Sequence, residues 1–322
     1  MRRSAGQAVI FALLLTAVVI TVGLAVVSQS IVDVKTSTQS QETVKAFTAA
    51  EAGIEKSLAF ALVAPDPTLT QTGSVGTAQY SARVVRLGYQ QHHYTLPRNM
   101  VSGDAQTLWL VSHDPSTGNL SCSGGLLCAT LSTTNSSFDV YFGRSPAAGP
   151  LPALALDIYY KTNPATSDYG DVEIARATFD PDSTRRTTKN NFGEALTAGP
   201  YVTSYGETYA YKARVDVGPG GLQVPTFNTE NGLQMIRARI LYSTADQPVS
   251  FDFADFAGET QRSLSSGDGL PSQGFKPEST GTIPNSSSIK LTSIYPWPDP
   301  FPMTDYAIIT INGSLCKGGA PC

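Results

Sequence analysis

The chain has 322 residues, of which 15% are charged, and its formal net charge at pH 7 is −4. Nucleic-acid-binding proteins normally present a basic patch or stripe, so this balance argues against a nucleic-acid partner. Few charges together with 28 glycines and 21 prolines are typical of an extracellular, β-rich protein with many turns.

A long apolar run begins shortly after Arg2 and Arg3, and residues 8–27 form a stretch of twenty without a charged side chain. Twenty helical residues span about 30 Å, the thickness of one hydrocarbon core. A cleaved secretory signal usually has an apolar region of only about 7–15 residues, so the run predicts a retained membrane anchor. The arginines before it, compared with the balanced Asp33 and Lys35 after it, indicate a cytoplasmic N-terminus and a chain that continues outside the cytoplasmic membrane.

The helical pattern continues beyond the membrane-length run. Apolar side chains recur every three or four residues, as they do along one stripe of an amphipathic helix. These residues are Val44, Phe47, Ala50, Ile54, Leu58 and Leu62. Pro65 and Pro67 end the pattern, because the residue before a proline disfavours the α region. We therefore expect one helix over residues 7–64, with a membrane span at about 8–27.

Two short motifs carry a resemblance to a known family. The basic segment before the run ends in Gly6-Gln7, and residues 46–58 read AFTAAEAGIEKSL. In both features about the first 60 residues resemble a type IV pilin-like prepilin with a PilX N-terminal-type segment. The resemblance implies that residues 1–6 are a leader, removed when a prepilin peptidase cuts between Gly6 and Gln7. It also implies methylation of the new amine on Gln7 and packing of the helix into a filament core. The assembly residues that we assign to this helix are Phe11, Phe47, Ala50, Glu51, Ile54 and Leu58.

Phe11 departs from the pattern of most major pilins, which carry glutamate at the fifth position counted from Gln7. A carboxylate in an apolar core is costly unless it is paired, and in major pilins it pairs with the N-terminal amine of a neighbouring subunit. Phenylalanine lacks that docking signal, and a head of about 255 residues would crowd a tightly wound shaft. The resemblance therefore implies a minor or tip subunit of a type IV pilus (fimbrium) or of a related secretion pseudopilus.

Such a subunit would have other pilin subunits, the prepilin peptidase and the inner-membrane assembly platform as partners. Its head would prime assembly or adhere to a surface or host-cell ligand, using aromatic side chains such as those of YPWPDPF at 295–301. The alternative is a single-pass, membrane-anchored surface adhesin that does not polymerise.

The segment 68–322 contains β-branched or aromatic runs separated by turn-rich stretches, and several of the runs alternate with period two. The runs are 78–87, 106–112, 137–142, 152–161, 170–179, 207–217, 233–242, 249–253, 288–296 and 305–311. This spacing favours an antiparallel, sandwich-like head over a βαβ fold, so the whole chain is predicted to be α+β. A glycine-rich stretch at 216–225 could divide the head into two domains.

Four cysteines form two similar settings, because Cys122 and Cys128, like Cys316 and Cys322, enclose five residues that include a glycine pair. Disulfides are the natural state outside the membrane. In the loop-entropy model a local bridge contributes about 2 kcal/mol and a bridge from Cys122 to Cys316 about 5 kcal/mol. The glycines let a tight loop turn, and we expect local pairing. The rival interpretation is a four-cysteine zinc site, although structural zinc cysteines usually lie two to four residues apart.

Catalytic patterns are scarce. The sequence has no G-x-S-x-G, phosphate-binding loop or zinc-binding His/Glu helix, so we expect neither an enzyme nor a cofactor. The doublet His92-His93 reads as a surface hairpin rather than a metal site. Asp180 and Asp182 lie in a loop that could hold calcium, but the other ligands of a calcium loop are missing, which favours a solvated turn.

Overall fold

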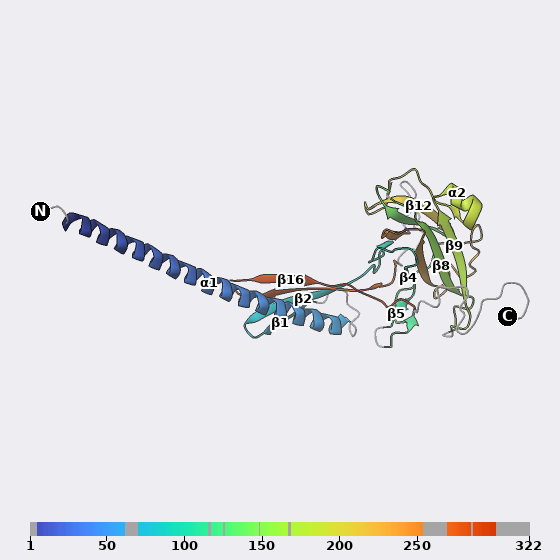
Figure 1. Ribbon diagram of the computed structural model, residues 1–322. Coiled ribbons are helices and arrows are strands. Elements are labelled where there is room, and N and C mark those ends of the chain that lie inside the picture. The colour runs from blue at the N-terminus through green and yellow to red at the C-terminus, as the bar shows by residue number, and fades with distance from the viewer. Residues whose placement is uncertain are drawn as a thin grey trace, which may run out of the picture. The chain divides into compact units, whose positions relative to one another are not determined.

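The computed structural model describes residues 5–61, 70–114, 117–124, 126–147, 149–166, 169–253, 269–284 and 286–300 (Figure 1). These residues form one long apolar N-terminal helix and a β-rich remainder whose sheets are mainly antiparallel, an α+β layout. The chain divides into two compact units. Unit 1 is Met1–Val85 with Lys276–Ser293, and unit 2 is Arg86–Phe275 with Ile294–Cys322.

Unit 1 is built from helix α1 (Ala5–Ala61) and a sheet in the order β1-β2-β15-β16. The strands are β1 (Thr70–Val75), β2 (Ala78–Arg86), β15 (Gly274–Thr282) and β16 (Ser288–Thr292). β1 pairs with β2, and β15 pairs with β16, in antiparallel register. The second half of α1 lies along this sheet, in contact with β1 and β16 (Figure 1). In unit 2, β17 (Tyr295–Pro296) pairs with the first residues of β15.

Unit 2 contains two five-stranded sheets and a short hairpin. One sheet has the order β10-β9-β8-β13-β4, made of Gly193–Glu194, Val172–Asp180, Ala153–Lys161, Leu233–Leu241 and Ala105–Trp109. The other has the order β11-β12-β7-β14-β3, made of Tyr201–Val202, Thr208–Asp216, Ser137–Arg144, Val249–Asp252 and His93–Thr95. β5 (Ser112–His113) pairs with β6 (Leu120–Ser121). A short helix α2 (Ser183–Arg185) and a π-helical turn (Arg186–Asn190) follow β9.

Both five-stranded sheets contribute alternate side chains to one buried core. Leu154, Leu156 and Ile158 come from β8 of the first sheet, and Val249 and Phe251 come from β14 of the second. All five residues are fully buried. Because successive strand residues point to opposite faces, this period-two pattern gives each sheet one face toward the core. Burial of each such side chain contributes roughly 1.5–3 kcal/mol, so this cluster is the main source of stability in unit 2.

Most predicted strands were placed well by pattern alone. Each predicted run within the described residues overlaps a strand, whereas 305–311 lies outside them. β1, β15 and short strands such as β3 and β11 were not among the predicted runs. The helix expected over 7–64 is seen as Ala5–Ala61. The stretch 216–225 lies inside unit 2, where Val217 and Val224 are buried and the Val224 N–H donates to the Val217 carbonyl (2.9 Å).

Candidate functional site

The first part of α1 presents apolar side chains on every side. From Val9 to Val34 its large apolar residues are between 54% and 75% exposed, and Phe11 is the most exposed of them. Among the described residues, α1 is the one helix that is long and apolar enough to cross a membrane. Two of its hydroxyl groups are satisfied within the helix. The Thr16 hydroxyl donates to the Ala12 carbonyl (3.0 Å) and the Thr21 hydroxyl donates to the Val18 carbonyl (2.8 Å). Neither hydroxyl therefore needs water, which suits a helix in an apolar environment.

The second part of α1 is held on the sheet of unit 1 by small residues. The buried residues of this part are Ala46, Ala49, Ala50, Gly53 and Ser57. We call them the small-residue stripe; they are spaced three or four apart and so lie on one side of the helix. Gly281 of β15 lies against them so closely that an added Cβ would collide with the Ala46 carbonyl oxygen. The backbones of α1 and β15 therefore touch with no side chain between them.

This arrangement differs from the apolar stripe expected from the sequence. Of that set, Ala50 is buried against the sheet, Ile54 and Leu58 lie half-buried at its border, and Val44 and Phe47 are exposed. Leu62 lies outside the described residues. The prediction chose the larger apolar side chains because they are the more hydrophobic. A helix that packs closely on a sheet needs small side chains at the contact. The spacing Ala-x-x-Ala-Ala-x-x-Gly in 46–53 was the signal that could have identified the stripe.

The other side of α1 is left uncovered by the described residues of unit 1. At about 100° per residue, Val44 and Glu51 project roughly 140–160° from Ala46, and Phe47 projects about 100° from it. The exposed fractions of Val44 and Phe47 are 61% and 41%, and Glu51 is also exposed. The predicted assembly residues are thus divided between a face that packs on the sheet and a face that is free to contact another molecule.

Polar contacts strengthen unit 1 around the helix. The Ser286 hydroxyl donates to the Glu42 carboxylate of α1. On the sheet, Glu278 accepts from Arg83 (2.8 Å) and forms a second ion pair with Lys290 (3.2 Å). Hydrogen bonds from Arg83 and then from Lys290 lower the pKa of Glu278 to about 2. Glu278 therefore stays charged at any physiological pH and links strands β2, β15 and β16.

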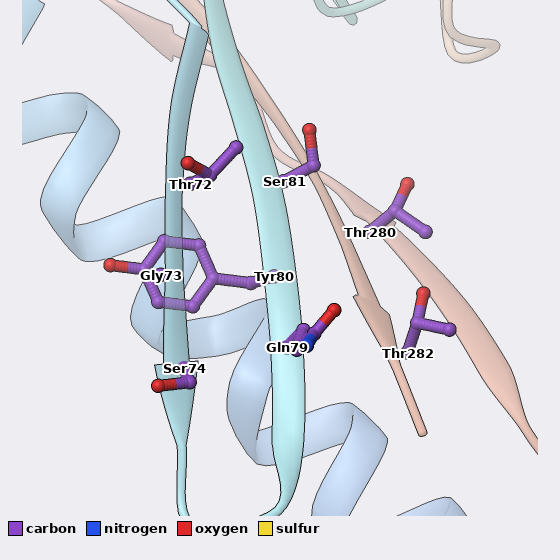
Figure 2. Close-up of a pocket in the computed structure, with 8 residues that line it drawn as sticks. All are labelled: Thr72, Gly73, Ser74, Gln79, Tyr80, Ser81, Thr280 and Thr282. Carbon is purple, nitrogen blue, oxygen red and sulfur yellow. The ribbon is translucent and has the colours of Figure 1, made fainter. Parts of the chain in front are cut away.

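A shallow pocket of about 550 Å³ lies on three strands of unit 1 (Figure 2). Hydroxyl-bearing residues line it from β1, β2 and β15, namely Thr72, Ser74, Ser81, Thr280 and Thr282. Successive side chains of a strand point to opposite faces of the sheet. Gly281 and the half-buried Tyr80 lie on the face that packs against α1, so the hydroxyl-bearing residues next to them in sequence belong to the opposite face. None of the described residues that line this pocket is charged, so this lining offers hydrogen bonds but no centre of charge.

The predicted cleavage site lies at the start of the helix. Gly6 and Gln7 both fall within α1, which begins at Ala5, and residues 1–4 lie outside the described residues. The Gly6–Gln7 bond therefore lies at the edge of the membrane-length run. Cleavage itself stays a prediction.

In unit 2, Cys122 and Cys128 form a disulfide with a Cα–Cα distance of 5.5 Å. This is the local pair expected from the sequence. It links the end of the β5–β6 hairpin to Cys128, which forms an isolated antiparallel β-bridge with Val111 through its backbone. Cys316 and Cys322 lie outside the described residues, so their pairing stays a prediction.

The two aspartates considered for calcium are used for contacts within the protein. Asp180 is fully buried, and both of its oxygens accept from Arg185 at 2.6 Å, with Asn190 donating to one of them. Burial raises the pKa of Asp180, but the hydrogen bonds from Arg185, from the Asp182 N–H and from Asn190 outweigh it, and the pKa is lowered. Asp182 caps helix α2 by accepting from the Arg185 N–H. The loop is thus not the solvated turn that the sequence favoured, because Asp180 takes part in a buried ion pair and Asp182 in a helix cap.

The histidines also differ from the expected surface hairpin. His93 is buried, its Nε2 lies 3.0 Å from Glu207, and its ring stacks on Tyr205. His113 stacks on Trp297 with ring centroids 4.6 Å apart, and burial lowers the pKa of His113 to about 4. The Trp297 indole N–H donates to the Ser272 carbonyl (2.8 Å). Trp297 therefore has a packing role, and of the proposed adhesive aromatics that are described, Tyr295 is the exposed one.

Comparison of the chain with protein-family models, with curated proteins and with solved structures finds no match.

Proposed function

We propose that the chain is a minor or tip subunit of a type IV pilus or a related filament, anchored and assembled through α1. The observation that carries the proposal is the division of α1 into two differently used parts. Its second part is fixed to the chain's own sheet by the small-residue stripe, whereas the large apolar side chains of its first part are 54–75% exposed among the described residues. A helix of this kind needs an external apolar environment.

The energetic argument favours burial in lipid first and among other helices later. Each large apolar side chain that leaves water contributes roughly 1.5–3 kcal/mol. More than ten such residues lie between Val9 and Val34. The free-energy cost of exposing this segment to water would therefore exceed the free energy of unfolding of a typical domain. Lipid provides the apolar environment for an anchored subunit. In a filament, the same side chains would pack against neighbouring helices, with Val44 and Phe47 extending that contact beyond the membrane.

Phe11 supports a position at the filament end rather than in the shaft. It is 75% exposed and cannot form the charge pair that a carboxylate would form with a neighbouring amine. A subunit with phenylalanine there would lose the attraction that draws successive subunits into the shaft. It would be tolerated where one neighbour is missing.

We further propose that the two five-stranded sheets of unit 2 form an antiparallel, sandwich-like head outside the membrane. The single core to which both sheets contribute supports this arrangement. In a tip subunit, that head would prime assembly or contact a surface ligand.

Shearing of cells combined with intact-mass measurement tests the proposal against the non-polymerising adhesin. The proposal predicts that the chain begins at Gln7, that deletion of the prepilin peptidase or a Gly6→Val change leaves the precursor uncut, and that shearing releases the chain with the filaments. An adhesin that does not polymerise would stay in the membrane fraction after shearing. A mature chain that begins beyond Val27 would contradict both interpretations, since the anchor would be gone.

A further inference from the structure

Unit 2 contains a pocket whose wall includes a buried lysine. The pocket has a volume of about 510 Å³, within the range of small-molecule sites. Lys161 at the end of β8 is only 2% exposed and lines this pocket. A lysine is almost never so deeply buried unless its charge is paired.

The ammonium group of Lys161 is only partly satisfied. Its Nζ donates to the Thr166 carbonyl (2.7 Å) and lies 4.9 Å from the centroid of the Tyr169 ring. An ammonium group has three donors, and no carboxylate among the described residues forms an ion pair with Lys161. A buried cation without a counter-charge is costly, so an anion that entered the pocket would gain a strong, charge-assisted hydrogen bond.

The remaining lining shows what kind of anion would fit. Ser121, Ser123 and Asn231 supply hydroxyl and amide groups, and Tyr169 supplies an aromatic ring that is 49% exposed. Hydroxyl and amide groups match the hydroxyls of a sugar, and an aromatic face packs against the C–H groups of its ring. Glu230, an exposed residue of the same lining, is the one acidic group there, and its charge opposes that of an anionic ligand.

We propose that this pocket binds a carboxylate-bearing sugar, such as a uronic or sialic acid unit of a surface polymer, with Lys161 as the carboxylate receptor. The Cys122–Cys128 disulfide holds part of the pocket wall, because Cys122 follows the β5–β6 hairpin and itself lines the pocket. The inference concerns unit 2 alone and holds whether or not α1 assembles into a filament.

Calorimetric titration of the full chain in detergent micelles tests this site with two matched probes. Glucuronic acid carries a carboxylate at C6 where glucose carries a hydroxymethyl group, and the two sugars are otherwise the same. We therefore expect glucuronic acid to bind about 10- to 100-fold more tightly than glucose. Lys161→Gln should remove that difference. Glu230→Gln should strengthen glucuronic acid binding several-fold, and reduction of the disulfide should weaken it. Lys189→Gln, which removes an exposed charge outside the pocket, is the matched control and should change nothing.

Several results would overturn the proposal. Equal binding of glucuronic acid and glucose, or no binding of either, would exclude a carboxylate receptor. Binding of an oligoglutamate peptide in place of glucuronic acid would assign the pocket to an acidic protein instead. If Lys161→Gln fails to fold, the test rests on two exposed positions. Glu230→Gln should strengthen the binding of glucuronic acid and Tyr169→Leu should weaken it, and unchanged affinity in both variants would exclude the site.

Discussion

The contact between the small-residue stripe and β15 makes a quantitative prediction for Gly281→Ala. An added Cβ would collide with the Ala46 carbonyl oxygen and lie 2.7 Å from the Ala50 backbone nitrogen. Both are backbone atoms of a helix, so no side chain can rotate away. Ordinary contact requires about 3.5 Å, so the Ala50 nitrogen alone would require α1 to move about 0.8 Å away from the sheet, and the nearer Ala46 oxygen would require more. Overpacking of this kind typically costs about 1–3 kcal/mol.

A matched glycine series separates this contact from general effects of alanine. Gly53→Ala would meet the side chains of Ser279 and Tyr80, which can adjust, and alanine is favoured over glycine in a helix by about 1 kcal/mol. We therefore expect a small net effect there, and Ser279→Ala should relieve it further. Gly23→Ala meets nothing within 4 Å and serves as the control.

Differential scanning calorimetry of the full chain in detergent provides the measurement. For a unit of about 100 residues, 1 kcal/mol corresponds to a shift of about 4–8 °C. Gly281→Ala should therefore lower the melting temperature of the transition of unit 1 by about 5 °C or more, with Gly53→Ala between it and Gly23→Ala. Equal melting temperatures for all three variants would refute the close backbone contact.

Three further predictions concern charge. Phe11→Glu should increase incorporation along the filament shaft, measured as the ratio of this chain to the major pilin in sheared filaments, and an unchanged ratio would assign the exclusion to the size of the head. Asp180→Asn should destabilise unit 2 by about 3–5 kcal/mol in urea unfolding, because it breaks the close, buried ion pair with Arg185 (2.6 Å) and leaves Arg185 only the longer pair with Asp182 (4.0 Å), whereas a change below about 1 kcal/mol would contradict the structural role of the pair. The pKa of Glu278 is lowered to about 2, so its stabilising effect is present above the unfolded pKa and is lost as pH falls from about 4.5 toward 2. Glu278→Gln should therefore reduce stability at pH 7 and make it less sensitive to acid over that range, and an identical acid dependence of both proteins would count against this.

The sequence predicted the elements better than their partners. The 57-residue helix and most of the long strands followed from periodicity and proline positions, because these are local signals, whereas the nine-residue β15 was not among the predicted runs. The pairing of β2 with β15 could not be predicted in this way, since these strands are about 190 residues apart in the chain. The apolar stripe expected on α1 was displaced for a related reason. Periodicity reports apolar character, but the approach of β15 through Gly281 decides which side of the helix is covered.

The candidate sites show the same limit. The Cys122–Cys128 pair was predictable, because the two cysteines are only six positions apart in the sequence and two glycines between them allow the turn. The burial of Asp180 was not predicted because its partners Arg185 and Asn190 are brought to it by the short helix α2 and the π-helical turn that follows. The sequence carries no signal for this local geometry. Lys161 carried no signal at all, since its burial and the pocket beside it arise from three separate segments.

Immunogold labelling of unit 2 on intact cells and on sheared filaments tests the central claim most directly. A minor or tip subunit assembled through α1 predicts label at one end of the filament, at a small fraction of the abundance of the major pilin. Label along the whole filament would contradict the tip position and make this an unusually large shaft subunit. Label confined to the cell envelope, with filaments bare, would contradict assembly and leave α1 as a membrane anchor only.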